Sequence, residues 1–268
     1  MANDYARTQR VIAALPHKEL TRGSAISARN WLLANYTPNL ARRNLVQISA
    51  CCSWGVNSGF IDFNPFQGLA KEIKLKRITE KNLGFSREER DIIISAFEDS
   101  KPYKFYAPFV KFLFLTGCRP SEAIALTWSD ISDKFIRLHQ AAVDTPKGIL
   151  IKPGLKTQQE RRFPINSQLS DLLKKIRTDT QNPKHLVFSG INGGIINFRN
   201  FCQRVWKVVL STLAIDYQHP YTCRHTFISL CLMSDVGVKD IAGWVGNSPE
   251  IIYRHYVRDK INLEVPEL

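Results

Sequence analysis

The sequence predicts a mainly α-helical protein with one small antiparallel β-sheet, an α+β fold in two domains. Over most of the chain, apolar residues recur at spacings of three and four, which places them on one face of a helix. The pattern changes in short runs typical of strands, with turns between them, at residues 135–139, 149–152 and 162–165. The 268 residues, 44% hydrophobic and 23% charged, suffice for one large or two smaller hydrophobic cores.

The first predicted domain, residues 1–80, is helical. Thr37 followed by Pro38 predicts a helix start, because a threonine side chain caps the first turn and proline fits its first position. The apolar face of this helix consists of Ala41, Leu45, Ile48, Cys52 and Val56. Another helix is expected from about Ser24, and a basic linker over residues 71–77 leads to the domain boundary.

The second predicted domain, residues 81–268, begins with a helix marked by Ser86 and Glu89, which have the spacing of a capping box. Gly117 is expected to end a helix, because glycine adopts the left-handed backbone conformation common at helix ends. Pro120 is expected to start a short one. After the strands, further helices are expected over residues 169–176, 198–213, 223–233, 238–244 and 250–256.

Positive charge dominates the sequence. Its 37 Lys and Arg against 24 Asp and Glu leave a formal net charge of +13 at pH 7, which favours a polyanionic partner such as nucleic acid. No acidic residue occurs between Glu19 and Asp62, so this stretch is expected to carry an unopposed positive field. We expect it to hold a DNA phosphate backbone through Arg22, Arg29, Arg42 and Arg43.

The composition argues against a membrane protein and against a disulfide scaffold. Apolar runs such as residues 112–115 are far shorter than the roughly 20 residues of a membrane span, and the first residues do not resemble a signal peptide. We therefore expect a cytoplasmic protein. The 6 cysteines form no CxxC pair and no zinc-type spacing, so they are expected to be reduced and to behave as small buried residues.

Four segments of the chain combine arginine, lysine and tyrosine in a definite order. They are residues 116–122 (TGCRPSE), 155–165 (LKTQQERRFPI), 221–227 (YTCRHTF) and 246–256 (GNSPEIIYRHY). Together they resemble the tyrosine recombinases, the phage integrase family. The resemblance covers nearly the whole chain, and it implies a helical core-binding domain with the basic linker over residues 1–80 and a catalytic domain over residues 81–268.

The resemblance also implies an activity and partners. The implied protein is a site-specific recombinase or integrase of a mobile element, located with the nucleoid, which cleaves and rejoins DNA through a 3′-phosphotyrosyl intermediate. Its implied partners are double-stranded DNA, three further copies of itself in a tetramer on synapsed sites, and accessory DNA-bending proteins. No cofactor or metal is expected. The alternatives are a catalytically weakened relative that binds DNA, and a type IB topoisomerase-like enzyme.

The first candidate residues are cations that the resemblance assigns to the phosphate. Arg119 and Arg224 match the two arginines of the family, whose guanidinium groups bind nonbridging oxygens as charge accumulates. Glu122 matches the acid that supports the first arginine. Lys156 matches the lysine that donates a proton to the leaving 5′ oxygen, with Lys152 as a nearby rival.

Tyr256 matches the nucleophilic tyrosine of the family. Tyr253 is its rival, because residues three apart share one helix face. Two positions depart from the family pattern: Tyr221 stands where histidine is usual, and Asn247 where histidine or tryptophan is usual. A phenol is a poor base at neutral pH, so we expect both residues to position the phosphate. His225 is expected to be a packing residue, and the chain after residue 256 either docks on a neighbouring subunit or frays.

Overall fold

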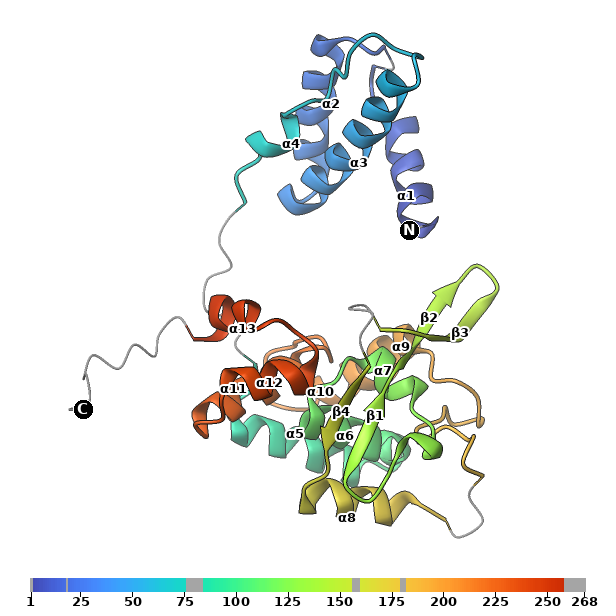
Figure 1. Ribbon diagram of the computed structural model, residues 1–268, viewed down its shortest axis with the longest axis vertical. Coiled ribbons are helices and arrows are strands. Elements are labelled where there is room, and N and C mark those ends of the chain that lie inside the picture. The colour runs from blue at the N-terminus through green and yellow to red at the C-terminus, as the bar shows by residue number, and fades with distance from the viewer. Residues whose placement is uncertain (1, 18, 76–83, 156–159, 179–181, 258–268) are drawn as a thin grey trace, which may run out of the picture. The chain divides into compact units, whose positions relative to one another are not determined.

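The computed structural model describes residues 2–17, 19–75, 84–155, 160–178 and 182–257 (Figure 1). The chain divides into two compact units, Met1–Thr79 and Glu80–Leu268, and each has its own hydrophobic core. Helices dominate both units, and the described strands lie in the second, which confirms the predicted mainly helical fold with a small antiparallel β-component. No helix among the described residues is long and apolar enough to cross a membrane.

The first unit is built from helices. They are α1 (Ala2–Ala13), α2 (Arg22–Asn35), α3 (Pro38–Asn57) and α4 (Leu69–Glu72). The predicted start of α3 is confirmed, because the Thr37 hydroxyl accepts a hydrogen bond from the backbone of Leu40. Helix α2 begins slightly earlier than expected, since Thr21 caps it. Helix α1 is not predicted from the sequence. It packs on α3, and Thr8 Oγ1 donates to Asn44 Oδ1 over 3.4 Å.

The first helix of the second unit begins at the predicted capping box. Ser86 Oγ accepts from the Glu89 backbone over 3.1 Å, and Glu89 Oε2 accepts from the Ser86 backbone over 2.8 Å. The first helices are α5 (Arg87–Asp99), η1 (Lys104–Tyr106), α6 (Ala107–Thr116), α7 (Pro120–Ala125) and η2 (Trp128–Asp130). After the strands follow α8 (Ser167–Ile176), α9 (Phe198–Asn200), the π-helical η3 (Phe201–Trp206), α10 (Lys207–Leu210), α11 (Thr222–Met233), α12 (Val238–Val245) and α13 (Pro249–Tyr256).

The β-structure differs in detail from the expected single sheet. It consists of two antiparallel pairs: β1 (Phe135–Leu138) with β4 (Arg161–Pro164), and β2 (Gln140–Thr145) with β3 (Gly148–Pro153). Strand β2 is not predicted from the sequence, because it contains no strongly apolar alternation and none of its residues is fully buried. The β1–β4 pair positions the site, since Leu138 is the register partner of Arg161.

Helix α6 carries the core of the second unit and ends beside α11. Phe109 and Phe112 are buried in this core, and α6 packs on α5, α8 and α11. Gly117 ends α6 in the left-handed conformation, as predicted, with φ of +56°. A Cβ atom there would lie 2.5 Å from the ring of Phe227 in α11. Only glycine permits this close approach, which brings the following turn against α11.

A second apolar cluster joins the last three helices. Ile228 of α11, Ile241 of α12 and Ile252 of α13 are buried in it, and Tyr256 packs against it. Figure 1 shows these helices together at the red end of the colour scale. The cluster determines which side of α13 faces α11, and therefore which of its tyrosines points inward.

Candidate active site

Glu122 is the centre of a buried ion-pair cluster. Its side chain is 1% exposed and accepts from the backbone N and from Nη1 of Arg119, each over 2.9 Å. It also accepts from Nη1 and Nη2 of Arg161, over 3.2 and 2.5 Å. Burial alone would raise the pKa of the Glu122 carboxyl, but the hydrogen bonds and charges of the two arginines outweigh it and lower the pKa. The ionised carboxylate thus holds both arginines in place.

Both arginines also contact the C-terminal end of α12. Arg119 Nη2 donates to the carbonyl of Gly246 over 3.1 Å, and Arg161 Nε donates to the carbonyl of Trp244 over 2.7 Å. Gly246 ends α12 with φ of +68°, and a Cβ there would lie 3.1 Å from the Arg161 guanidinium. Helix α7, strand β4 and the end of α12 are therefore joined, which sets the position of Asn247.

Arg161 is a residue of this cluster that the sequence analysis does not single out. It begins β4, within the segment of residues 155–165, and an arginine at a strand end ordinarily faces solvent. The available signal was Glu122, since a carboxylate that pairs with one arginine still has acceptor capacity for a second. The sequence therefore indicates that the Glu122 carboxylate can accept from a further donor, but it does not indicate which arginine provides that donor.

Arg224 is buried at the start of α11. It is 2% exposed, and its Nη1 donates to the carbonyl of Gly117 over 3.0 Å. Its Nη2 is buried and has no hydrogen-bond partner among the described residues. Burial lowers the pKa of Arg224, and the charges of Arg119 and Arg161 act in the same direction. A buried guanidinium with an unused donor among like charges is stabilised when an anion approaches.

Tyr256 points inward from α13 onto His225 of α11. Its Oη lies 2.5 Å from Nδ1 of His225, and the two rings stack with centroids 5.5 Å apart. Burial raises the pKa of the Tyr256 phenol to about 12, an effect that Arg224 partly opposes. Tyr253, the rival on the same helix, is 55% exposed. The structure therefore separates two tyrosines that the helical spacing alone leaves equivalent.

Tyr221 and Asn247 border the cluster. Tyr221 is 37% exposed, and its ring meets the His225 ring edge-on with centroids 5.7 Å apart. The backbone N of Tyr221 donates to Nδ1 of His219 over 3.2 Å. Asn247 is half-buried directly after Gly246. Both residues thus lie near the buried arginines.

Some predictions fall outside the described residues. They are Lys156, the chain after residue 257, the end of the basic linker and the domain boundary at residue 80. Lys152, the rival of Lys156, is exposed in β3. The roles of both lysines therefore stay predictions.

The predicted basic stretch of the first unit is not electrostatically unopposed. Arg22 donates to the carbonyls of Pro65 and Gln67, each over 2.8 Å, and lies 3.9 Å from Glu72. Arg29 forms an ion pair with the same Glu72. The expectation of an unopposed positive field is therefore wrong for Arg22 and Arg29, because folding brings Glu72 of α4 beside α2. The other two predicted arginines, Arg42 and Arg43, are exposed on α3.

The cysteines are free, and most of them are buried. Burial raises the pKa of Cys118 to about 12 and that of Cys223 far above its ordinary value, so neither thiol ionises readily beside its arginine. The expectation that all six are buried is wrong for Cys51, which is exposed on α3, and Cys231 is half-buried. The packing interpretation holds for the two cysteines next to the site.

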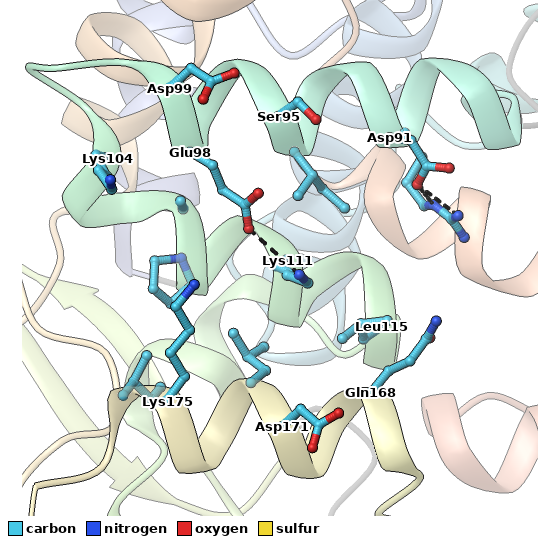
Figure 2. Close-up of a pocket in the computed structure, with 16 residues that line it drawn as sticks. Asp91, Ser95, Glu98, Asp99, Lys104, Lys111, Leu115, Gln168, Asp171 and Lys175 are labelled. Atoms are coloured by element: carbon cyan, nitrogen blue, oxygen red, sulfur yellow. Dashed lines mark hydrogen bonds and ion pairs between the residues drawn. The ribbon is translucent and has the colours of Figure 1, made fainter.

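A separate cavity of about 780 Å³ lies between α5, α6 and α8 (Figure 2). Acidic and basic side chains line it together, and Glu98 pairs with Lys111 over 3.5 Å. None of the predicted site residues lines this cavity. The predicted site residues lie instead in and around the buried cluster of Glu122 and Arg224.

Comparison with known proteins identifies the class of protein. Residues 85–261 match the model of the phage integrase family, so the chain belongs to this family. It is 23% identical over 266 residues to a protein of Escherichia coli (strain K12) that bears the name defective protein IntQ, covering 89% of this chain and 65% of the relative. It is 25% identical over 236 residues to tyrosine recombinase XerC of Thermodesulfovibrio yellowstonii, covering 84% of this chain and 73% of that relative. The chain thus spans about two thirds of the length of the curated relatives it matches.

Solved structures share the fold. The Tn1549 transposon integrase, in complex with a circular intermediate DNA, superposes with a TM-score of 0.80 at 15% identity, covering 97% of this chain and 90% of that one. A lambda integrase tetramer bound to a Holliday junction gives a TM-score of 0.73 at 13% identity, covering 100% of this chain and 73% of that one. These similarities extend over both units of the chain.

Proposed function

We propose that this protein is a site-specific DNA recombinase, an integrase that cleaves and rejoins DNA through a 3′-phosphotyrosyl intermediate. The observation that carries the proposal is the buried Nη2 of Arg224, which has no partner among the described residues. Arg119 and the Tyr256 phenol lie within its electrostatic reach. An anion clamp beside a hydroxyl nucleophile is what transfer of a phosphodiester requires. Membership of the phage integrase family supports the same reaction.

The proposed reaction conserves the phosphodiester energy. Tyr256 Oη attacks the phosphorus, and the bond to the 5′ oxygen breaks as the phosphotyrosyl bond forms. Arg119 and Arg224 bind the nonbridging oxygens on which negative charge accumulates, with Glu122 holding Arg119. Lys156 donates a proton to the leaving 5′ oxygen. The 5′-hydroxyl of another strand then attacks the phosphotyrosyl bond, releases the tyrosine and rejoins the DNA.

Two polar residues would position the phosphate. Tyr221 and Asn247 can each donate a hydrogen bond from a neutral group. The half-buried amide of Asn247 follows Gly246, whose carbonyl holds Arg119, and this placement supports a role beside that arginine.

The proposed partner is double-stranded DNA, held by residues 1–80 as the core-binding domain and by residues 81–268 as the catalytic domain. The net charge of +13 supports this partner. The lambda integrase tetramer on a Holliday junction supports a homo-tetramer on two synapsed sites. Accessory DNA-bending proteins, a mobile-element origin and a cytoplasmic, nucleoid location belong to the same proposal.

Covalent capture tests the reaction. Wild-type protein, Tyr256→Phe and Tyr253→Phe are incubated with nicked duplexes from the ends of the genetic element that encodes the protein. The nick lets the fragment with the 5′-hydroxyl diffuse away, so the phosphotyrosyl bond persists. We expect a denaturant-resistant protein–DNA band from wild type and from Tyr253→Phe, the exposed matched control, and no band from Tyr256→Phe.

Gel shifts on the same duplexes distinguish the alternatives. Tight binding without a covalent band favours a DNA-binding relative. The observation in favour of this alternative is that Tyr221 and Asn247 depart from the family pattern. A covalent band on any duplex, together with relaxation of supercoiled plasmid, favours a topoisomerase-like enzyme. A band restricted to one sequence supports the recombinase.

A further inference from the structure

We propose that His225 is the general base that takes the proton from Tyr256. This inference rests on the proposed function, because it assigns a role within the same reaction. The two groups come from different helices, α11 and α13, and meet with Oη 2.5 Å from Nδ1. That separation is within reach for direct proton transfer, and no water has to lie between the two atoms. His225 therefore touches the attacking atom and is a catalytic residue in this proposal.

The other candidates for a base are less well placed. Tyr221 occupies the position where histidine is usual, but a phenol is a weak base at neutral pH, and its ring meets the His225 ring in a T-shaped contact. His219 is turned away from Tyr256: its Nδ1 accepts from the Tyr221 backbone, and its Nε2 lies 3.6 Å from Cys202 Sγ. His225, by contrast, is hydrogen-bonded to the Tyr256 hydroxyl itself.

The surroundings keep His225 neutral. Burial lowers its pKa below the ordinary 6.5, and electrostatic interaction with Arg224 on its own helix and with His255 on α13 lowers it further. The titratable groups whose rings face it are the phenols of Tyr221 and Tyr256. A neutral imidazole protonated on Nε2 presents Nδ1 as an acceptor, which the Tyr256 hydroxyl needs if it is to donate.

The tyrosine in turn needs a base. Burial raises the pKa of Tyr256 to about 12, so the phenolate is scarce at neutral pH. In the proposed step, the proton moves from Oη to Nδ1 as the bond from Oη to phosphorus forms and the bond to the 5′ oxygen breaks. His225 becomes an imidazolium beside Arg224, a like-charge arrangement that favours return of the proton. During rejoining, the imidazolium gives the proton back to the departing tyrosine oxygen.

The test compares three variants by single-turnover cleavage over a pH series. His225→Ala removes the base, whereas His225→Asn keeps a polar atom near the position of Nδ1 but cannot take a proton. His185→Ala is the matched control, because His185 is exposed elsewhere in the same unit. Near neutral pH we expect both His225 variants to cleave about 100-fold or more slowly than wild type, with unchanged DNA binding, and His185→Ala to match wild type.

The pH profile separates a base from a structural contact. The wild-type rate should fall only as the pH drops below the lowered pKa of His225, whereas the variant rates should rise about tenfold per pH unit as more phenolate forms. Added imidazole should restore His225→Ala. Wild-type rates in His225→Asn would instead assign a positioning role, and cleavage by His225→Ala at the wild-type rate or faster would show that the reaction does not need the imidazole. Either result overturns the proposal.

A measurement without DNA keeps the two proposals distinguishable. ¹⁵N-histidine NMR of the wild-type protein should show Nδ1 of His225 unprotonated at neutral pH, and a proton on Nδ1 overturns the assignment as a base. If Tyr256→Phe still forms the covalent band, or wild type binds its site and forms none, the proposed function fails whatever the NMR result.

Discussion

Arg161 and Glu122 form a buried two-pronged ion pair between β4 and α7, with Nη1 and Nη2 each bonded to a carboxylate oxygen. The side chains are 8% and 1% exposed, and Glu122 also holds Arg119. The arginine that is expected to bind phosphate is thus oriented by a carboxylate that a second arginine holds in place.

Removal of Arg161 should destabilise the second unit strongly. Arg161→Ala leaves the Glu122 carboxylate short of donors in a buried place, which costs about 3–5 kcal/mol of unfolding free energy. The matched control is Arg137→Ala, which breaks an exposed pair with Glu160 and should cost about 1 kcal/mol or less. Urea unfolding followed by circular dichroism measures both values. Equal losses would show that burial does not govern the Arg161 pair.

The same cluster predicts an acid-sensitive stability. The folded-state pKa of Glu122 lies below its ordinary value of 4.5, so its contribution to stability is fully present above the unfolded-state value. That contribution is lost as the pH falls through the folded-state pKa. We therefore expect the stability of Glu122→Gln to depend less steeply on pH than that of wild type below about pH 4.5. Thermal unfolding over a series of acid buffers tests this, and parallel pH profiles would contradict it.

Gly117→Ala should displace the turn that holds Arg119 and Arg224. Alanine at φ of +56° costs about 1–2 kcal/mol, and its Cβ would also lie 2.5 Å from the Phe227 ring. Gly193→Ala has a similar φ of +77° with nothing within 4 Å, so it measures the backbone cost alone. Unfolding free energies should show a clearly larger loss at Gly117. The two losses would be equal if the ring moved away freely.

DNA binding should depend more on Arg42 than on Arg29. Arg42 is exposed on α3, whereas Glu72 pairs with Arg29 and offsets its charge. If Arg42 contacts a phosphate, Arg42→Ala should lower the slope of log affinity against log salt by about 0.9. Glu72→Gln should strengthen binding, because it removes the negative charge that offsets the positive charges of Arg22 and Arg29. Fluorescence anisotropy titrations at several salt concentrations measure these effects, and weaker binding by Glu72→Gln would contradict the explanation.

Lys156 can be separated from Lys152 by changing the leaving group. A DNA substrate with sulfur in place of the bridging 5′ oxygen releases a thiolate, which needs no proton. Lys156→Ala should therefore cleave ordinary DNA slowly and the sulfur substrate at nearly the wild-type rate. Lys152→Ala should behave like wild type on both. Rescue of Lys152→Ala instead would reverse the assignment.

Features encoded by neighbouring residues were predictable. Thr37–Pro38, Ser86 with Glu89, and Gly117 each mark a helix end through the backbone conformation or hydrogen bond of a few adjacent residues, and the structure confirms all three. Strand β2 was not predictable, because its apolar alternation is weak and its formation depends on pairing with β3.

Contacts between distant residues were decided only by the tertiary structure. The sequence alone indicated the helical class, the family and the cations and tyrosines that could act on a phosphodiester. It could not indicate that Arg161 would reach Glu122, that Glu72 would neutralise Arg29, or that Tyr256 rather than Tyr253 would meet His225. Local periodicity and capping leave such partners undetermined, because side chains far apart in the chain become neighbours only when the packing of whole helices and strands sets their directions.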